Sequence, residues 1–230
     1  MLLSFQELLY TIRMLIIGHR GAAGLAPENT LASLQKALEH QVDMLEFDVR
    51  VTKDDVVVLH HDSVLLDGDG KKHDIPTTNF DELKQHKPDL ATFEEVLKDI
   101  DKVPLYIEVK PGVSTRPIID MLKDRNDSKR LFLASKSQAT LLELHKALPE
   151  LPVIVIEPWS GVRAHLRALQ LNTKIVSMNQ RWLWWGFIRG FKNGGWQLYA
   201  YTLDDPAKAR RWEKWGLAGV VTDYPDIFQS

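Results

Sequence analysis

The strongest constraint on the fold is a regular alternation of short apolar runs with helical patterns along the chain. The runs are rich in β-branched residues and have the length of buried strands. They cover residues 15–18, 44–49, 105–109, 131–134, 153–156, 174–177, 197–201 and 219–222. Strands that alternate with helices in this way predict a closed parallel TIM (β/α)8 barrel. A doubly wound open sheet is the alternative.

Two segments depart from this alternation. Residues 56–59 predict an extra strand paired with the second one, and residues 63–90 form a polar insertion with no strong helical pattern. After Thr222 only eight residues remain, too few for a normal last helix. The apolar residues 2–12 would either form a compensating helix under the barrel or extend as a frayed terminus. We expect one domain over residues 1–230, with the insertion inside it.

Charged residues alternate with apolar ones in the second expected strand. Alternation puts Glu46, Asp48 and Arg50 on one face, which points into the interior of a barrel. Two carboxylates about 7 Å apart along a strand repel each other there and lose hydration. A bound cation relieves both costs, so the pattern predicts a metal site. A buried ion-pair network with Arg50 is the alternative.

The third expected strand places Glu108 and Lys110 on one face near its carboxyl end. A strand-end salt bridge explains this pair equally well when it is taken alone. Together with Glu46 and Asp48, however, Glu108 completes an all-oxygen set of ligands. Such a set suits one divalent cation, Mg²⁺ or Ca²⁺, with Mn²⁺ also possible, better than zinc.

Two histidines follow expected strands, on the side where barrel enzymes place their active sites. His19 follows the first strand and His61 follows the extra strand. Two imidazoles beside a metal can divide general acid and general base work near neutral pH. Arg20 offers a planar fork for a phosphate group, and Lys110 offers a point charge.

Composition narrows the class of protein. The chain has 29 Lys+Arg and 31 Asp+Glu, a formal charge of −2, which argues against a dedicated nucleic-acid binder. With no cysteine, disulfides and thiolate metal sites are excluded. No apolar run reaches the roughly 18–20 residues of a membrane span, and the start of the chain is a poor signal peptide. We therefore expect a cytoplasmic protein.

Five stretches of the chain resemble the glycerophosphodiester phosphodiesterase family. They read IIGHRGAAGLAPENTLASLQKAL, LEFDVRVTKDDVVVLHHDSVL, LYIEVKPG, LYAYTLDD and GVVTDYPD. The resemblance implies a phospholipase-C-like phosphodiesterase barrel with a divalent cation on Glu46, Asp48 and Glu108. It also implies that His19 and His61 are the acid–base pair, His61 being matched because it directly precedes Asp62.

A member of this family is expected to hydrolyse small glycerophosphodiesters, such as glycerophosphocholine or glycerophosphoethanolamine. The products would be sn-glycerol 3-phosphate and an alcohol. The sequence leaves open which histidine is the acid, and whether water or the glycerol 2-hydroxyl attacks. Headgroup selectivity would lie in residues 63–90, which we expect over the pocket. The oligomeric state is equally open.

Several further residues are candidates for the surroundings of the site. Glu28 is expected to orient His19 and raise its pKa, whereas Asn29 or Thr30 would cap the first helix. Asn179 and Tyr201 follow or end later strands and are placed to line the pocket and contact substrate. Asp62 is expected to support His61.

The run 181–196 is dense in aromatic residues, namely Trp182, Trp184, Trp185, Phe187, Phe191 and Trp196. Packing of a helix on the barrel is the favoured explanation. Contact with lipid headgroups or acyl chains is the alternative. It would accompany a lysophospholipase D-type activity at a membrane surface. A catalytically silent binding domain is a third possibility, which the full set of site residues argues against.

Overall fold

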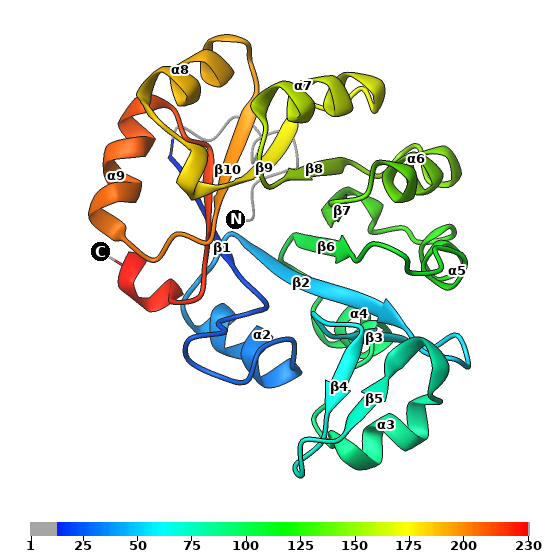
Figure 1. The fold of residues 1–230 in the computed structure, drawn as a ribbon. Helices are drawn as coiled ribbons and strands as arrows, with labels where there is room; N and C mark the ends of the chain where they lie inside the picture. Colours follow the sequence, from blue (N-terminus) through cyan, green and yellow to red (C-terminus); the bar gives the residue numbers. More distant parts are fainter. Residues whose placement is uncertain (1–12, 230) are drawn as a thin grey trace.

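The computed structural model describes residues 13–229, which form a closed barrel with helices on its outside (Figure 1). The barrel strands are β1 (Leu15–Gly18), β2 (Met44–Val51), β6 (Leu105–Val109), β7 (Leu131–Ser135), β8 (Val153–Glu157), β9 (Ile175–Asn179), β10 (Gln197–Tyr201) and β11 (Gly219–Thr222). They are parallel, and β1 pairs with both β2 and β11, which closes the barrel. The predicted (β/α)8 barrel is confirmed.

Helices follow the strands in the order that the alternation predicts. They are α2 (Leu31–Glu39), α4 (Phe93–Asp99), α5 (Arg116–Leu122), α6 (Gln138–Ala147), α7 (Gly161–Gln170), α8 (Trp185–Asn193) and α9 (Pro206–Trp215). Short 3₁₀ turns η1 (Ile75–Thr77), η2 (Ser128–Arg130), η3 (Gln180–Trp182) and η4 (Pro225–Phe228) complete the list. Between β11 and residue 229, where the described chain ends, the structure has only η4, as the short remainder predicts. The helix expected at residues 2–12 lies outside the described residues.

Side-chain alternation along the strands separates two parts of the core. In β2, Leu45, Phe47 and Val49 join the layer between the barrel and its helices. Met44 lies inside the barrel with Tyr106, Phe132 and Tyr199. Glu46 and Asp48 share the face of Met44, and both are buried. The interior of the barrel is therefore apolar where the strands begin and charged where they end.

The insertion forms a small unit of its own beside β2. The extra strand β3 (Val57–Leu59) pairs antiparallel with β2, and β4 (Val64–Leu66) pairs antiparallel with β5 (Lys72–Asp74). Helix α3 (Phe80–His86) covers this hairpin, although the sequence shows no strong helical pattern there. A separate apolar cluster of Val58, Leu65, Ile75, Leu83 and Leu90 holds the unit together. A helix of seven residues with one buried leucine is too short to produce a clear period.

The aromatic run splits into an inner and an outer set. Phe187, Phe191 and Trp196 pack against the core, as the packing explanation predicts. The other three are exposed, at 50% for Trp182, 64% for Trp184 and 58% for Trp185. For these three tryptophans the favoured explanation is wrong. Trp182 lies in η3 and Trp184 precedes α8, so neither belongs to the packed helix. Trp185 is in α8, whose fully buried residue is Ile188.

Candidate active site

Three buried carboxylates meet at the carboxyl ends of neighbouring strands. Asp48 of β2 is in register with Glu108 of β6, and Glu46 lies one alternation earlier on the same face. Each residue offers one oxygen, and the three oxygens all lie within 4.8 Å of one another. The side chains are nearly inaccessible, with Asp48 only 1% exposed. The convergence that the strand pattern predicts is present.

Positive groups compensate two of these carboxylates directly. Lys110 Nζ donates to Asp48 Oδ1 at 2.9 Å and to Glu108 Oε1 at 2.8 Å. Lys136 Nζ lies 3.1 Å from the same Glu108 oxygen, and Arg20 Nε lies 3.3 Å from Asp48 Oδ2. Burial raises the pKa of Asp48, but the charges of Lys110 and Arg20, with a hydrogen bond from Asn29, outweigh it and lower this pKa to about 2.

Glu46 is compensated much less. Its Oε2 accepts a hydrogen bond from the Arg20 backbone N–H at 2.8 Å and lies 4.0 Å from His19 Nε2. No Lys or Arg among residues 13–229 has a salt-bridge contact with it. Burial, together with the charges of Asp48 and Glu108, raises the pKa of Glu46 to about 7. Glu46 is therefore the carboxylate of this cluster that pairs with no Lys or Arg side chain in the described chain.

Each candidate histidine has a carboxylate of its own. His19 Nδ1 lies 2.6 Å from Asp223 Oδ1, and His61 Nδ1 lies 2.8 Å from Asp62 Oδ1. Burial lowers the pKa of His19, but the hydrogen bond with Asp223 and the charge of Glu46 outweigh it, so the net shift is upward. For His61, burial is the largest cause and the net pKa shift is downward. Arg50 donates to the His61 carbonyl oxygen at 2.8 Å rather than pairing with the strand carboxylates.

The structure corrects the position expected for Glu28. Both of its oxygens accept from Arg20 Nη1, at 2.7 and 2.8 Å, and the residue that contacts His19 is Asp223. Asp223 follows β11, and β11 lies beside β1 because the barrel closes there. The two residues are 204 positions apart, so no local pattern links them. The prediction that the barrel closes between its first and last strands could have shown that they are neighbours.

Asn29 is a second residue whose role the sequence did not reveal. Its Nδ2 donates to Asp48 Oδ2 and its Oδ1 accepts from the Asp48 backbone N–H, both at 3.0 Å. Thr30 caps α2 by accepting from the Ser33 N–H. Asn29 therefore orients a candidate metal ligand, while its neighbour starts the helix.

The cluster opens into a cavity of about 430 Å³ at the carboxyl end of the barrel. The lining includes all of the catalytic and metal-ligand candidates, together with Arg20, Lys136, Asn179 and Tyr201. The Tyr201 hydroxyl is buried and has no hydrogen-bond partner within the described part of the chain. Lys110, expected to contact phosphate, is absent from this lining because both of its contacts go to carboxylates. The lining likewise contains no residue of 63–90, so the insertion does not form the wall expected of it.

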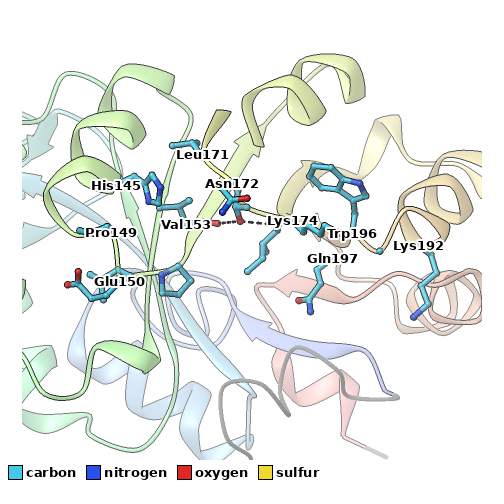
Figure 2. Close-up of a pocket in the computed structure, with 15 residues that line it drawn as sticks. His145, Pro149, Glu150, Val153, Leu171, Asn172, Lys174, Lys192, Trp196 and Gln197 are labelled. Carbon is cyan, nitrogen blue, oxygen red and sulfur yellow. Dashed lines mark hydrogen bonds between the residues drawn. The ribbon is translucent and has the colours of Figure 1, made fainter. Parts of the chain in front are cut away.

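Two other features hold similar groups but lie elsewhere. A pocket of about 500 Å³ lies where β8, β9 and β10 begin, lined by His145, Glu150, Lys174 and Lys192 among others (Figure 2). In barrels this end carries stability rather than catalysis. In the insertion, Asp67, His73 and His86 also converge within 4.8 Å, with His73 Nε2 at 2.9 Å from Asp67 Oδ2. Neither feature shares a residue with the cavity at the carboxyl end.

The donor set of the strand carboxylates fits a hard divalent cation. All three ligands are oxygens, and the contacts of Lys110 and Lys136 with Glu108 both go to Oε1. Glu46, with its raised pKa and no ion pair to a Lys or Arg side chain in the described chain, is the group whose charge a metal would stabilise most. The residues present therefore suit a cation such as Mg²⁺ or Ca²⁺ without identifying it.

Comparisons with known proteins agree with this geometry. The model of the Glycerophosphoryl diester phosphodiesterase family matches residues 19–227. The glycerophosphodiester phosphodiesterase of Bacillus subtilis is 28% identical, over 97% of this chain and 88% of its own length. A human lysophospholipase D is 23% identical over 91% of this chain and 83% of its own.

A solved structure matches equally widely. It is a phosphodiesterase of Oleispira antarctica in complex with the product sn-glycerol-3-phosphate, and it is 25% identical with a TM-score of 0.86. The match covers 96% of this chain and 97% of that one. Because the family match spans nearly the whole chain and every later strand of the barrel, the chain belongs to the glycerophosphoryl diester phosphodiesterase family.

Proposed function

We propose that this chain is a metal-dependent phosphodiesterase that hydrolyses glycerophosphocholine, glycerophosphoethanolamine or similar diesters to sn-glycerol 3-phosphate and an alcohol. The observation that carries the proposal is one cavity in which three buried carboxylates meet two imidazoles, each imidazole with its own carboxylate. The B. subtilis relative is named for this activity, and the O. antarctica structure contains its phosphate product.

Glu46, Asp48 and Glu108 would hold the cation, which supplies positive charge to the phosphate oxygens when bound. One of His19 and His61 takes the proton from the attacking water or glycerol 2-hydroxyl, and the other gives a proton to the leaving alkoxide. Asp223 and Asp62 fix the two rings through Nδ1, which leaves Nε2 of each ring for the substrate. Both proton transfers would therefore use the Nε2 atoms of His19 and His61, whose orientation Asp223 and Asp62 determine.

Cationic and polar groups around the cavity would bind the phosphate and the glycerol. Arg20 is held by Glu28 and Asp48 while it lines the cavity, so its planar fork is pre-oriented. Lys136 lines the same cavity and takes over the phosphate contact that we expected of Lys110. Lys110 instead neutralises Asp48 and Glu108. Asn179 and the unpaired Tyr201 hydroxyl are placed to bind substrate hydroxyls.

The direct test is removal and return of the metal. We expect chelation with EDTA to abolish release of glycerol 3-phosphate from glycerophosphocholine, and Mg²⁺, Ca²⁺ or Mn²⁺ to restore it. Full activity after thorough chelation would contradict the metal site. His61→Ala should lower kcat about 10²- to 10⁴-fold, the usual contribution of one acid–base group. His60→Ala is the matched control, since His60 does not line the cavity.

A lysophospholipase D-type activity is the second candidate. It is favoured by the relatives that carry this name, such as the human protein at 23% identity. The two activities are separated by measuring turnover of glycerophosphocholine and of lysophosphatidylcholine with the same preparation. Faster kcat/KM on the lysophospholipid would identify the lipid as the preferred substrate.

A further inference from the structure

One side of the barrel exposes an unusual number of large apolar side chains. They come from the loop after β8, from α7, and from the segment between β9 and α8. The members are Trp159 (65% exposed), Val162 (72%), Leu166 (56%), Leu169 (57%), Trp182 (50%), Trp184 (64%) and Trp185 (58%). We call these seven residues the tryptophan face. Apolar groups gathered at this density on a monomer surface indicate an interaction site.

Helix α7 is turned with its bulky side chains outward. Val162, Leu166 and Leu169 follow the spacing of one helix face, and all three are exposed. The opposite face is buried and consists of Ala164, Arg167 and Ala168. Arg167 is fixed there by the Ile156 carbonyl oxygen at 2.9 Å and by Glu157 at 3.3 Å. Because these contacts of Arg167 hold one face of α7 against the barrel, the opposite face, which carries Leu166 and Leu169, is exposed.

The tryptophan face adjoins the mouth of the catalytic cavity. Gln180 and Arg181 line that cavity, and Trp182 is the next residue. Helix α7 packs on β8 and β9, and α8 packs on β10, the next strand of the barrel (Figure 1). A Cβ on Gly161, the first residue of α7, would lie 2.2 Å from the Phe187 ring of α8. Helices α7 and α8 are therefore in contact near their first turns, so the aliphatic and aromatic parts of the tryptophan face come from adjoining elements.

Charge is distributed unevenly around this surface. Residues 158–203 contain six Lys and Arg and no Asp or Glu, in a chain whose total charge is −2. Lys174 and Lys192 line the pocket at the opposite end of the barrel, so four arginines belong to the side that carries the tryptophan face. Of these, Arg163 and Arg167 pair with Glu157. Arg181 and Arg189 are exposed and make no ion pair with any residue of 13–229. The exposed tryptophans are thus bordered by uncompensated positive charge.

We propose that the tryptophan face docks on an anionic lipid surface and holds the mouth of the cavity against it. Tryptophan side chains prefer the headgroup region, and exposed arginines add attraction to anionic lipids. No helix within residues 13–229 has the length and apolar character to cross a bilayer. A second copy of the chain fits the face poorly, because two basic surfaces would be opposed.

The docking itself does not rest on the proposed catalytic roles. One consequence of the docking does rest on those roles: phosphodiester lipids would reach the cavity without leaving the membrane surface. For this reason the test measures binding without turnover. Folding is checked by circular dichroism and thermal unfolding.

The experiment is flotation of the full chain with vesicles of phosphatidylcholine alone, or with about one third phosphatidylglycerol. We expect binding to the anionic vesicles, weakened in about 1 M salt, where the Debye length is about 3 Å. The double substitution Trp184→Ala and Trp185→Ala should weaken binding at least about tenfold, since each indole inserts a large apolar area. Arg189→Glu should weaken it about tenfold, because one cation near an anionic surface contributes about fivefold and reversal adds repulsion.

Matched controls come from the insertion on the other side of the molecule. Leu66 is 61% exposed and Lys72 is exposed, so Leu66→Ala and Lys72→Glu make the same kinds of change outside the tryptophan face. Both should bind as the parent chain does. Absence of binding to anionic vesicles, or equal losses in these controls, would overturn the proposal. So would a dimer in sedimentation velocity that the double tryptophan variant abolishes, because the face would then be a protein interface.

Discussion

Two buried glutamates belong to parallel strands of this barrel, and they differ in how their charge is compensated. Glu157 at the end of β8 has Arg163 Nη2 at 3.1 Å and Arg167 Nη1 at 3.3 Å, and it accepts from the Trp159 N–H at 3.1 Å. Glu46 in β2 has one backbone N–H, and His19 Nε2 at 4.0 Å. The first glutamate is 0% exposed and the second 3%, so burial does not distinguish them.

The difference in partners separates a structural carboxylate from a functional one. A buried carboxylate with two guanidinium partners has no remaining need for a cation, and it holds α7 against the barrel. A buried carboxylate beside two others, with a pKa raised to about 7, is stabilised when a cation binds or a proton is taken up. The candidate site is therefore distinguished by a buried carboxylate without a cationic side chain paired to it, and not by the presence of acidic residues alone.

The largest effect should come from removing the uncompensated carboxylate. We expect Glu46→Gln to lower kcat/KM for glycerophosphocholine about a thousandfold, since a metal ion supplies several kcal/mol of charge stabilisation. Glu157→Gln, assayed well below its unfolding temperature, should retain turnover within a few fold. Similar losses of kcat/KM in the two variants would show that the presence or absence of cationic partners does not distinguish a structural glutamate from a functional one.

The same pair should behave in the opposite way in stability. Glu157→Gln leaves Arg167, which is 9% exposed, without a charged partner, so it should lower the free energy of unfolding by about 3 kcal/mol. Urea denaturation at neutral pH measures this value. Without metal, Glu46→Gln should destabilise the fold much less, because Glu46 pairs with no Lys or Arg side chain in the described chain and has His19 Nε2 no closer than 4.0 Å. A loss of stability in Glu46→Gln as large as in Glu157→Gln would contradict the comparison.

The histidine partners allow a finer comparison. Asp223 and Asp62 both contact a candidate catalytic imidazole, but their side chains are 31% and 74% exposed. We expect Asp223→Asn to lower kcat about 10- to 100-fold, as loss of an orienting carboxylate does in comparable sites. Asp62→Asn should cost less, because water screens an exposed pair and can replace its hydrogen bond. Steady-state kinetics of the two variants tests the order.

The positions of the strand carboxylates could be predicted from the sequence, because local patterns determine them. Alternation along β2 and β6 placed Glu46, Asp48 and Glu108 inside the barrel, because the side-chain period of a strand does not depend on its neighbours. The same alternation gives Glu46 a charged neighbour on its own strand face, Asp48, whereas β8 is apolar before Glu157. It does not show that Glu157 has cationic partners. What separates the two glutamates is Arg167, which α7 turns inward in place of a leucine.

Contacts between distant segments were harder to predict. The resemblance placed Glu28 near His19, but Arg20 captures both of its oxygens, and Asp223 reaches the ring from the last strand. A bidentate pair between residues eight positions apart depends on side-chain directions that no periodic pattern specifies. The insertion escaped prediction for a similar reason, since strands of three residues are too short to show alternation.

The smallest effect is confined to the metal-free chain and to a narrow range of pH. The pKa of Glu46 rises from its ordinary value of 4.5 to about 7 on folding. Between these values the folded chain binds the proton more tightly than the unfolded chain does. The stability contributed by this group is therefore complete below about pH 4.5 and is lost as the pH rises toward about 7. Urea midpoints measured in EDTA should fall across this interval, and Glu46→Gln should flatten the decline. A parent chain whose midpoint is unchanged there would show that Lys110 and its neighbours already compensate all three carboxylates, and the distinction between Glu46 and Glu157 would then be one of position alone.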